Sequence, residues 1–189
     1  MLSDSLQRPH RVWCSADIYR TDRYVASLGF DKYRGTYVSH NGWHAHTPEP
    51  ASAEWLGANL RKSLLTAEQF DLKESEYDQD AWKSYREKSL QVYQTWLTEL
   101  ATSYRYRSEK SVMAKALRVS ASYPKDGLDP IKLLATNRKR GGVWDAIANT
   151  SRSLAVVKEI PFDASDEELG LGVREMLAIS TISGERIEM

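Results

Sequence analysis

The sequence has one cysteine, no excess of either charge and no long hydrophobic run, and each absence excludes a class of protein. Cys14 has no second cysteine to pair with, so an intramolecular disulfide is impossible and a reducing compartment is expected. Lysine plus arginine number 26, as do aspartate plus glutamate, whereas nucleic-acid-binding and polybasic membrane proteins usually carry excess cations. No apolar stretch approaches the about 18 residues of a membrane span, and the N-terminus has no hydrophobic signal region. These absences predict a cytoplasmic protein without a membrane anchor.

Sequence motifs of catalysis are also missing. The chain contains no G-x-S-x-G, H-E-x-x-H, Walker A or dinucleotide-binding motif. Cys14 lies in an alternating apolar stretch that is typical of a buried structural thiol rather than a nucleophile. The adjacent Glu167 and Glu168 fall in the first turn of an expected helix, where the helix dipole favours negative charge without any catalytic role. The sequence therefore predicts no enzymatic activity, no catalytic residues and no cofactor.

What the sequence does contain is an internal similarity between residues 51–65 (ASAEWLGANLRKSLL) and residues 164–178 (ASDEELGLGVREMLA). Aligned without gaps, they coincide at Ala51/Ala164, Ser52/Ser165, Glu54/Glu167, Leu56/Leu169, Gly57/Gly170, Arg61/Arg174 and Leu64/Leu177. Each stretch predicts an amphipathic helix that begins after a serine N-cap, and Glu168 completes a capping box in the second. A glycine inside a helix costs about 1 kcal/mol relative to alanine, so we expect close backbone contact there, helix against sheet. Chance similarity of two helices is the competing interpretation.

Strand-like segments precede each of these helices. In the first half they are residues 11–19, 23–30, 36–40 and 43–47, and in the second half residues 119–123, 128–136, 143–147 and 153–160. Each half thus reads ββββα, which predicts an α+β fold with a duplicated unit and pseudo-two-fold symmetry. We expect residues 1–189 to form a single domain, with repeat units at residues 11–67 and 118–180 and a connecting helical segment at residues 68–117.

The connecting segment contains the longest expected helix, residues 80–103, and a second short one at residues 109–117. One stripe of the long helix carries mainly aromatic and apolar side chains: Trp82, Tyr85, Ser89, Val92, Tyr93, Trp96 and Leu100. Before it, residues 68–80 are acidic, which fits either a solvated linker or a surface for a basic partner.

Three of the four histidines fall within seven residues around Asn41-Gly42, a dipeptide that favours a two-residue hairpin turn. In such a hairpin His44 and His46 share one face and His40 lies on the other. Two histidines without a neighbouring carboxylate or thiolate make a weak metal site, so we predict no metal and interpret them as surface or partner-facing residues.

Two basic stretches raise the alternative of a single-stranded nucleic-acid-binding module. Tyr104, Arg105, Tyr106 and Arg107 interleave aromatic rings with cations, a pattern that stacks bases or simply packs at a helix end. Arg138, Lys139 and Arg140 form a basic turn that contacts phosphate or is merely solvated. The zero net charge disfavours nucleic acid as the primary ligand.

A family resemblance rests on the two repeat helices, the second written SDEELGLGVREML, and on the long aromatic helix that runs into YRYRSEKSVMAKALRVSASYP. Over roughly residues 33–180 the chain resembles the immunity proteins of bacterial contact-dependent growth inhibition systems. The duplicated ββββα unit is also similar to the Whirly architecture of single-stranded nucleic-acid-binding proteins. Fold similarity alone does not transfer a function.

The resemblance implies a non-enzymatic cytoplasmic inhibitor of a toxin in bacterial competition. Its partner would be the cognate C-terminal toxin domain of a secreted adhesin, often a nuclease, whose active site it would cover. A cationic nuclease cleft is complemented by acidic groups. The predicted toxin-binding residues are Glu74, Glu76, Tyr77, Asp78 and Asp80, followed by His44 and His46.

Two further classes stay compatible with the residues themselves. A metal-dependent enzyme would use the histidine cluster, and a structural adaptor would differ from an immunity protein only in its partner. For the oligomeric state we expect a monomer or a weak homodimer, since exposed sheet edges support dimers.

Overall fold

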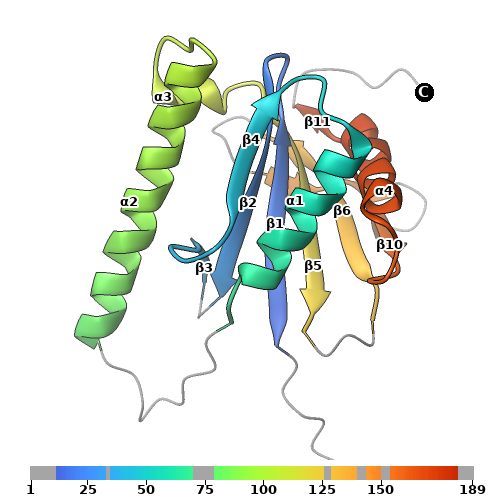
Figure 1. Cartoon of the computed structure of the whole chain (residues 1–189), viewed down its shortest axis with the longest axis horizontal. Coiled ribbons are helices and arrows are strands. Elements are labelled where there is room, and N and C mark those ends of the chain that lie inside the picture. The colour runs from blue at the N-terminus through green and yellow to red at the C-terminus, as the bar shows by residue number, and fades with distance from the viewer. Residues whose placement is uncertain are drawn as a thin grey trace, which may run out of the picture.

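Two antiparallel strands, β1 (Trp13–Arg20) and β5 (Leu117–Pro124), lie at the centre of a curled sheet in the computed structural model of the chain (Figure 1). The structure describes residues 12–32, 35–69, 79–125, 129–139, 144–149 and 154–182. Within these ranges the sheet has nine strands in the order β10-β6-β5-β1-β2-β3, with β4 also on β2, and β7 and β11 also on β6. The α+β class predicted from the sequence is confirmed.

The strands on either side of the central pair follow one pairing pattern. On one side β2 pairs with β1, and along its other edge the beginning of β2 pairs with β4 and its end pairs with β3. On the other side β6 pairs with β5, and along its other edge the beginning of β6 pairs with β10 and its end pairs with β7. The bounds on the first side are β2 (Tyr24–Lys32), β3 (Thr36–Val38) and β4 (His44–Pro48). Those on the second are β6 (Ile131–Arg138), β7 (Trp144–Ala146) and β10 (Val157–Ile160). The remaining short strands are β8 (Ala148–Asn149), β9 (Leu154–Ala155) and β11 (Thr181–Ile182).

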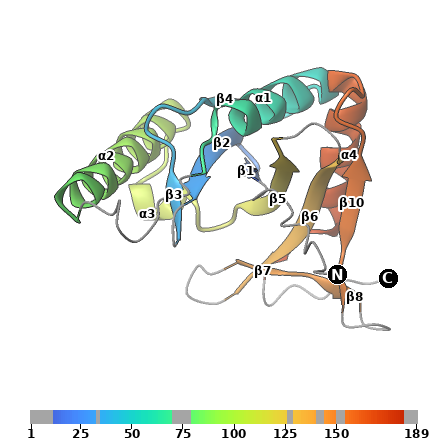
Figure 2. The same ribbon diagram turned by 90° about the horizontal axis from the view of Figure 1, so that it is seen from below.

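Helices cover both faces of the sheet. α1 (Ala53–Thr66) and α4 (Asp166–Ile179) pack against each other on one face (Figure 2). Their buried leucines meet the inward side chains of the central strands, which on β1 are Cys14, Ala16 and Ile18. α2 (Gln79–Ser103) and α3 (Glu109–Val112) pack on the other face of β1 and β2, around Tyr24 and the fully buried Trp96.

The N-terminal caps of α1 and α4 form as predicted. The Ser52 hydroxyl accepts a hydrogen bond from the Trp55 amide at 3.0 Å, and Ser165 and Glu168 form the reciprocal capping box. Such caps satisfy backbone amides that have no partner within the helix, so the two helix starts are fixed locally by sequence.

Gly57 and Gly170 mark the contact between α1 and α4. A Cβ on Gly57 would lie 1.8 Å from the carbonyl oxygen of Asp166, and a Cβ on Gly170 would lie 1.7 Å from that of Ala53. The close approach predicted from the glycines is therefore present, but it is helix against helix rather than helix against sheet. The two backbones approach so closely because each glycine sits under the first turn of the other helix.

Arginines repeat this reciprocal arrangement. Arg61 of α1 donates to the Ala164 carbonyl at 2.6 Å and to the Asp166 carboxylate at 2.8 Å. Arg174 of α4 donates to the Ala51 carbonyl at 2.6 Å. Each arginine thus ties its helix to the segment that leads into the other helix.

The predicted hairpin at Asn41-Gly42 is wrong. β3 and β4 do not pair with each other but lie one after the other along the same edge of β2, both antiparallel to it. The reason is a long-range contact, because the Trp43 amide donates to Thr66 Oγ1 at 2.7 Å and its indole donates to Asn59 at 2.9 Å, both on α1. The predicted placement of His40 on the opposite hairpin face from His44 and His46 therefore does not hold, since the hairpin is absent.

Other boundaries differ by smaller amounts. The long helix and its buried stripe are confirmed, whereas the second short helix is only α3, four residues long. The expected strand at residues 153–160 is divided into β9 and β10 at Val156, whose amide donates to the Ile147 carbonyl at 2.7 Å. Although α2 has 25 residues, it is too polar to cross a membrane, and no other helix in the described ranges qualifies.

Candidate functional site

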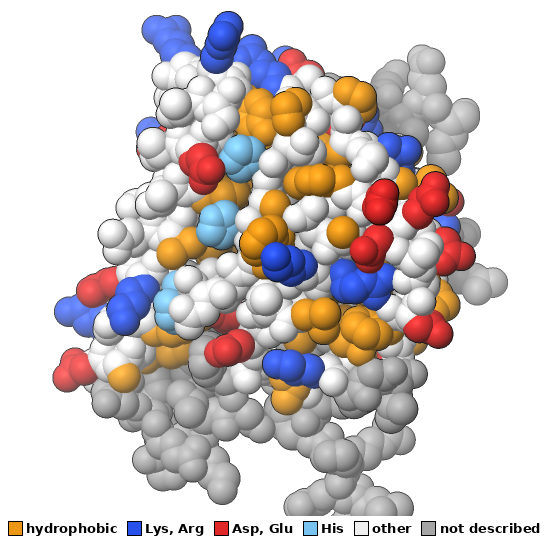
Figure 3. Space-filling view, viewed as in Figure 1, with side chains coloured by type: hydrophobic (Ala, Val, Ile, Leu, Met, Phe, Trp, Pro, Cys, Tyr) orange, Lys and Arg blue, Asp and Glu red, His pale blue; other side chains and the backbone are white. Residues whose placement is uncertain are grey.

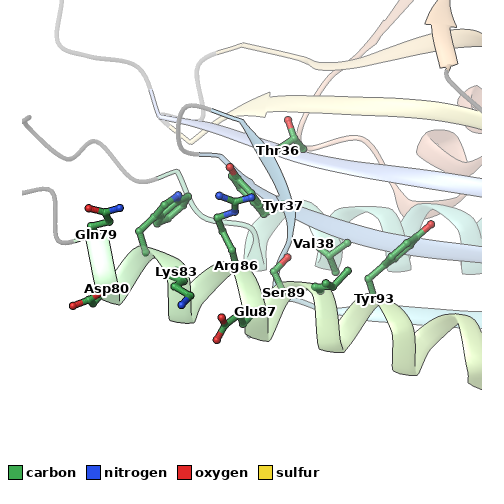
Figure 4. A pocket seen from close by; sticks show the side chains of 12 residues that line it. Thr36, Tyr37, Val38, Gln79, Asp80, Lys83, Arg86, Glu87, Ser89 and Tyr93 are labelled. Atoms are coloured by element: carbon green, nitrogen blue, oxygen red, sulfur yellow. The ribbon is translucent and has the colours of Figure 1, made fainter.

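A groove runs between β3 and the N-terminal half of α2, with a volume of about 850 Å3. Its β3 wall is Thr36, Tyr37 and Val38, and its α2 wall includes Asp80, Trp82, Arg86, Leu90 and Tyr93. Figure 4 shows Arg86, Ser89 and Tyr93 projecting from α2 toward β3, with Arg86 beside Tyr37. The groove joins residues that lie far apart in the sequence, because α2 returns along the edge of the sheet that β3 forms (Figure 1).

Aromatic contacts hold this part of α2 against the sheet. Trp82 stacks on Tyr85 with ring centroids 4.9 Å apart and meets Tyr37 edge to face at 5.2 Å. Tyr85 meets His40 edge to face at 4.8 Å, and its hydroxyl donates to the carboxylate of Asp31, which is 2% exposed. These contacts hold α2 in place against β3 and the sheet, while Arg86, Glu87 and Leu90 on the same helix are exposed to solvent.

The groove combines apolar and charged side chains. Leu90 is 56% exposed and supplies an apolar side chain to the groove. Asp80, Lys83, Arg86 and Glu87 also line the groove, so both signs of charge are present. Large aromatic rings, an arginine and an exposed leucine beside balanced charges are the composition of a protein-binding surface, where a few anchors carry most of the affinity.

The tyrosines of this region stay protonated. Burial raises the pKa of Tyr93, and burial together with the hydrogen bond to Asp31 raises the pKa of Tyr85. Neither ring contributes charge at neutral pH, so the charge of the groove comes from Asp80, Lys83, Arg86 and Glu87 of α2.

The structure brings only one predicted partner-binding residue to this groove. Asp80 lies at its α2 end, while Glu74, Glu76, Tyr77 and Asp78 fall outside the described residues. Asp80 also has a contact within the chain.

The two predicted histidines lie elsewhere, on β4. His44 is exposed, whereas His46 is engaged by the end of α2, with ring nitrogens 2.9 Å from the Tyr104 hydroxyl and 3.1 Å from the Glu99 carboxylate. Histidine side chains are visible on the surface of this side of the molecule (Figure 3). Of the two, His44 alone is fully available to a partner.

Several candidate nucleic-acid contacts are occupied within the protein. Tyr104 stacks on Tyr24 with centroids 5.2 Å apart, and Tyr106 meets the same ring edge to face at 6.0 Å, so neither ring is available for base stacking. Arg138 donates to the Ala114 carbonyl at 2.9 Å, and Lys139 pairs with Asp145. Arg140 lies outside the described residues.

The carboxylate of Asp17 is buried and hydrogen-bonded within the fold. It is 4% exposed, and it accepts hydrogen bonds from Tyr19 at 2.8 Å and from Arg118 at 3.3 Å. Burial raises the pKa of Asp17, while the Arg118 guanidinium acts in the opposite direction. A carboxylate so enclosed and so fully bonded is not accessible to a substrate. Among the described residues, no three His, Cys, Asp or Glu side chains gather where they could hold a metal ion.

Sequence reasoning missed the groove and its residues Tyr37, Arg86 and Leu90. The one signal in the sequence was Leu90, an apolar residue beside the aromatic stripe of α2 rather than within it. The position of β3 beside that helix depends on long-range packing that no local pattern reveals.

A family model and a solved structure both relate this chain to the same family. The model of the CDI immunity protein family (CdiI) matches residues 14–180. A protein of unknown function from Neisseria meningitidis has the same fold, with a TM-score of 0.69, 20% identity and coverage of 89% of this chain and 95% of that one. The CdiA-CT/CdiI toxin and immunity complex from Yersinia pseudotuberculosis contains a chain with a TM-score of 0.68, 18% identity and coverage of 89% and 97%. No curated protein sequence matches.

Proposed function

The chain belongs to the family of CDI immunity proteins, and we propose that it neutralises the toxin domain of a contact-dependent growth inhibition protein by binding it. The observation that carries this proposal is the extent of the family match, which covers residues 14–180 and so includes every helix and the central sheet. A related fold in a toxin and immunity complex supports the same conclusion. The partner would be the cognate toxin domain, encoded beside this chain.

The groove between β3 and α2 is the proposed docking surface. Leu90 and Arg86 contribute little to the fold, since both are exposed, and they line the groove together with Tyr37 and Trp82, whose rings pack on each other. An exposed apolar side chain next to a rigid aromatic wall gains most from contact with a partner, because binding removes apolar area from water at about 25 cal/mol per Å2. The predicted residues Glu74, Glu76, Tyr77 and Asp78 precede α2 directly and remain part of the proposed surface, with Asp80.

We further propose that the toxin is a nuclease and that binding covers its active site. A nuclease cleft is cationic, and acidic side chains at the α2 end of the groove would complement it and speed encounter. This mode of action would need no catalysis by the chain. It would take place in the cytoplasm of the protected cell.

We also propose that the two halves are copies of one ancestral ββββα unit with a Whirly-like arrangement. The reciprocal contacts of Gly57 and Gly170, and of Arg61 and Arg174, support this proposal, since a two-fold relation makes residue i contact j and j contact i.

Co-expression tests the function. The toxin domain encoded immediately upstream is produced with the full chain and the mixture is separated by size-exclusion chromatography. We expect one peak that contains both chains in equal amounts, and toxicity to the host when this chain is omitted. Two separate peaks, together with a harmless toxin domain, would end the proposal.

A further inference from the structure

Exposed cations gather where the end of α2 meets α3, beside the turn between β1 and β2. We define this basic corner as Arg23, Arg105, Arg107 and Lys110, all exposed. Two acids lie in the same segments, Asp22 and Glu109, and Glu109 accepts a hydrogen bond from Thr98 at 2.6 Å. Figure 3 shows Lys and Arg side chains at this end of the molecule, at the top of α2 in the view of Figure 1. The corner is cationic although the whole chain is neutral.

The alternation of tyrosine and arginine explains how the cations are presented. Tyr104 and Tyr106 turn inward onto Tyr24, and the Tyr106 hydroxyl donates to Thr21 at 3.0 Å. Because the half-buried tyrosines pack against the core, the arginines between and after them are exposed. The backbone that carries Arg105 and Arg107 is therefore ordered before any ligand binds.

Arg105 has a left-handed backbone conformation that glycine usually occupies. Its φ is 55°, in the left-handed region, and the following Tyr106 amide donates to the Ala101 carbonyl at 2.9 Å, which closes the end of α2. Helices that end in this way usually have glycine at the left-handed position, because a side chain there adds strain. Arg23 donates to the Tyr104 and Arg105 carbonyls at 3.0 Å each, so both of these carbonyls have a hydrogen-bond partner within the protein.

The side chain of Arg105, by contrast, has no role in the fold. Its guanidinium makes no hydrogen bond or ion pair within the part of the chain that the structure describes. A residue in a strained backbone conformation whose guanidinium makes no bond within the described protein leaves that guanidinium free to contact a ligand.

We propose that the basic corner binds the phosphate backbone of a nucleic acid. A protein partner is disfavoured because none of the strongly exposed large apolar residues, which are Leu65, Leu90, Val157, Leu171 and Ile179, belongs to the corner. Base stacking is disfavoured because both tyrosine rings already pack on Tyr24, and the Arg23 guanidinium lies over the Tyr106 ring. What remains is contact of cations with phosphates, which needs no exposed aromatic or apolar group and does not read sequence.

A hollow of about 650 Å3 beside the corner supports this assignment. It is lined by the cations Arg107 and Lys110, by one carboxylate, Glu109, and by Ala101 and the hydroxyl-bearing Thr98, Thr102, Tyr106 and Ser108. The hydroxyls of Thr98, Thr102 and Tyr106 already make hydrogen bonds within the protein, so Arg107 and Lys110 are the groups of this hollow that would contact phosphate oxygens. The inference goes beyond the proposed function, since it concerns a surface at the opposite end of α2 from the groove.

Fluorescence anisotropy with the purified full chain tests the site without any toxin, so its failure is distinct from failure of toxin binding. The probes are a labelled single-stranded RNA and a labelled DNA duplex, each titrated at several salt concentrations. Three contacts, at about 0.7 per phosphate for a single strand, predict a slope of log K against log salt of about −2. The duplex predicts a slightly steeper slope. Arg107→Gln with Lys110→Gln should reduce the single-strand slope to about −0.7, whereas Lys88→Gln, on α2 but outside both the corner and the groove, should leave it unchanged.

Arg105→Gly separates stability from binding. Because glycine relieves the left-handed strain, Tm should rise by about 2–4 °C, while affinity for the nucleic acid falls and the slope becomes shallower by about 0.7. Absence of binding at low salt would overturn the proposal, as would unchanged binding by Arg105→Gly. Preferential binding of an acidic polypeptide such as polyglutamate would overturn it in favour of a protein partner.

Discussion

Gly57 and Gly170 hold α1 and α4 in backbone contact, each beneath a carbonyl of the other helix, Asp166 and Ala53 respectively. No side chain fits in either position, since a Cβ would lie within 2 Å of a backbone oxygen that cannot rotate away. The packing of the two helices, and with it the main hydrophobic core, depends on both residues being glycine.

Alanine at either glycine should therefore destabilise the fold. We expect Gly57→Ala and Gly170→Ala each to lower the free energy of unfolding by about 3 kcal/mol, despite the better helix propensity of alanine. Gly172→Ala in the same helix is the matched control, because its Cβ would meet only side-chain atoms of Ile160 and Leu133, at 3.0 Å and beyond. Urea denaturation measures all three. Equal effects at Gly172 and Gly170 would contradict this account of the helix contact.

The two histidines of β4 should differ in their effect on stability. His46→Ala removes contacts with Tyr104 and Glu99 and should lower the free energy of unfolding by about 1–2 kcal/mol. His44→Ala changes an exposed residue and should stay within about 0.5 kcal/mol of the wild type. If toxin binding depends on His44, the same variant will lose affinity without losing stability. A loss of stability in His44→Ala comparable to that in His46→Ala would show that this assignment is wrong.

The capping box of α4 predicts a pH dependence. The Ser165 amide donates to the Glu168 carboxylate at 2.8 Å, and this bond, helped by the Ser165 hydroxyl, holds the pKa of Glu168 below its ordinary value. A carboxyl group whose pKa is lower in the folded state than in the unfolded state stabilises the fold above the unfolded pKa, and this contribution is lost as pH falls through the folded pKa.

Thermal unfolding from about pH 6 to pH 3 checks this contribution. Glu168→Gln should show a shallower loss of stability with falling pH than the wild type, while Glu167→Gln, which makes no capping bond in the described structure, should follow the wild type. Parallel curves for the wild type and Glu168→Gln would mean that the cap does not carry the pH dependence.

Charge and apolar changes in the groove test the docking surface. Arg86→Glu and Leu90→Asp should each weaken toxin binding by about 10- to 100-fold, with Tm unchanged, because both side chains are exposed in the free protein. Lys88→Glu is the control, since Lys88 lies on α2 outside the groove. Isothermal titration with the toxin domain gives the affinities. If Arg86→Glu and Leu90→Asp bind as tightly as Lys88→Glu does, the interface lies elsewhere.

Local signals in the sequence predicted the local features of the fold. The serine caps, the aromatic stripe of α2 and the close contact at Gly57 and Gly170 all follow from residue types at fixed spacing. Asn41-Gly42 failed as a hairpin signal because Trp43 binds α1, which is a contact between segments that no turn preference can foresee.

The groove was missed for the same kind of reason. Tyr37 and Arg86 become neighbours only when α2 returns along the edge of the sheet, so no spacing in the sequence indicates that they share a surface. The one local sign was Leu90, an apolar residue of α2 that lies outside the buried stripe of the helix.

The most direct test of the central claim is a titration of toxin activity. The purified toxin domain is held at a fixed concentration well above the dissociation constant, and its activity is measured as the full chain is added. Neutralisation by binding predicts that activity falls linearly and is lost when one chain is present for each toxin domain. Activity that persists at a large excess of the chain would contradict immunity, and complete loss at far less than one chain per toxin would contradict binding without catalysis.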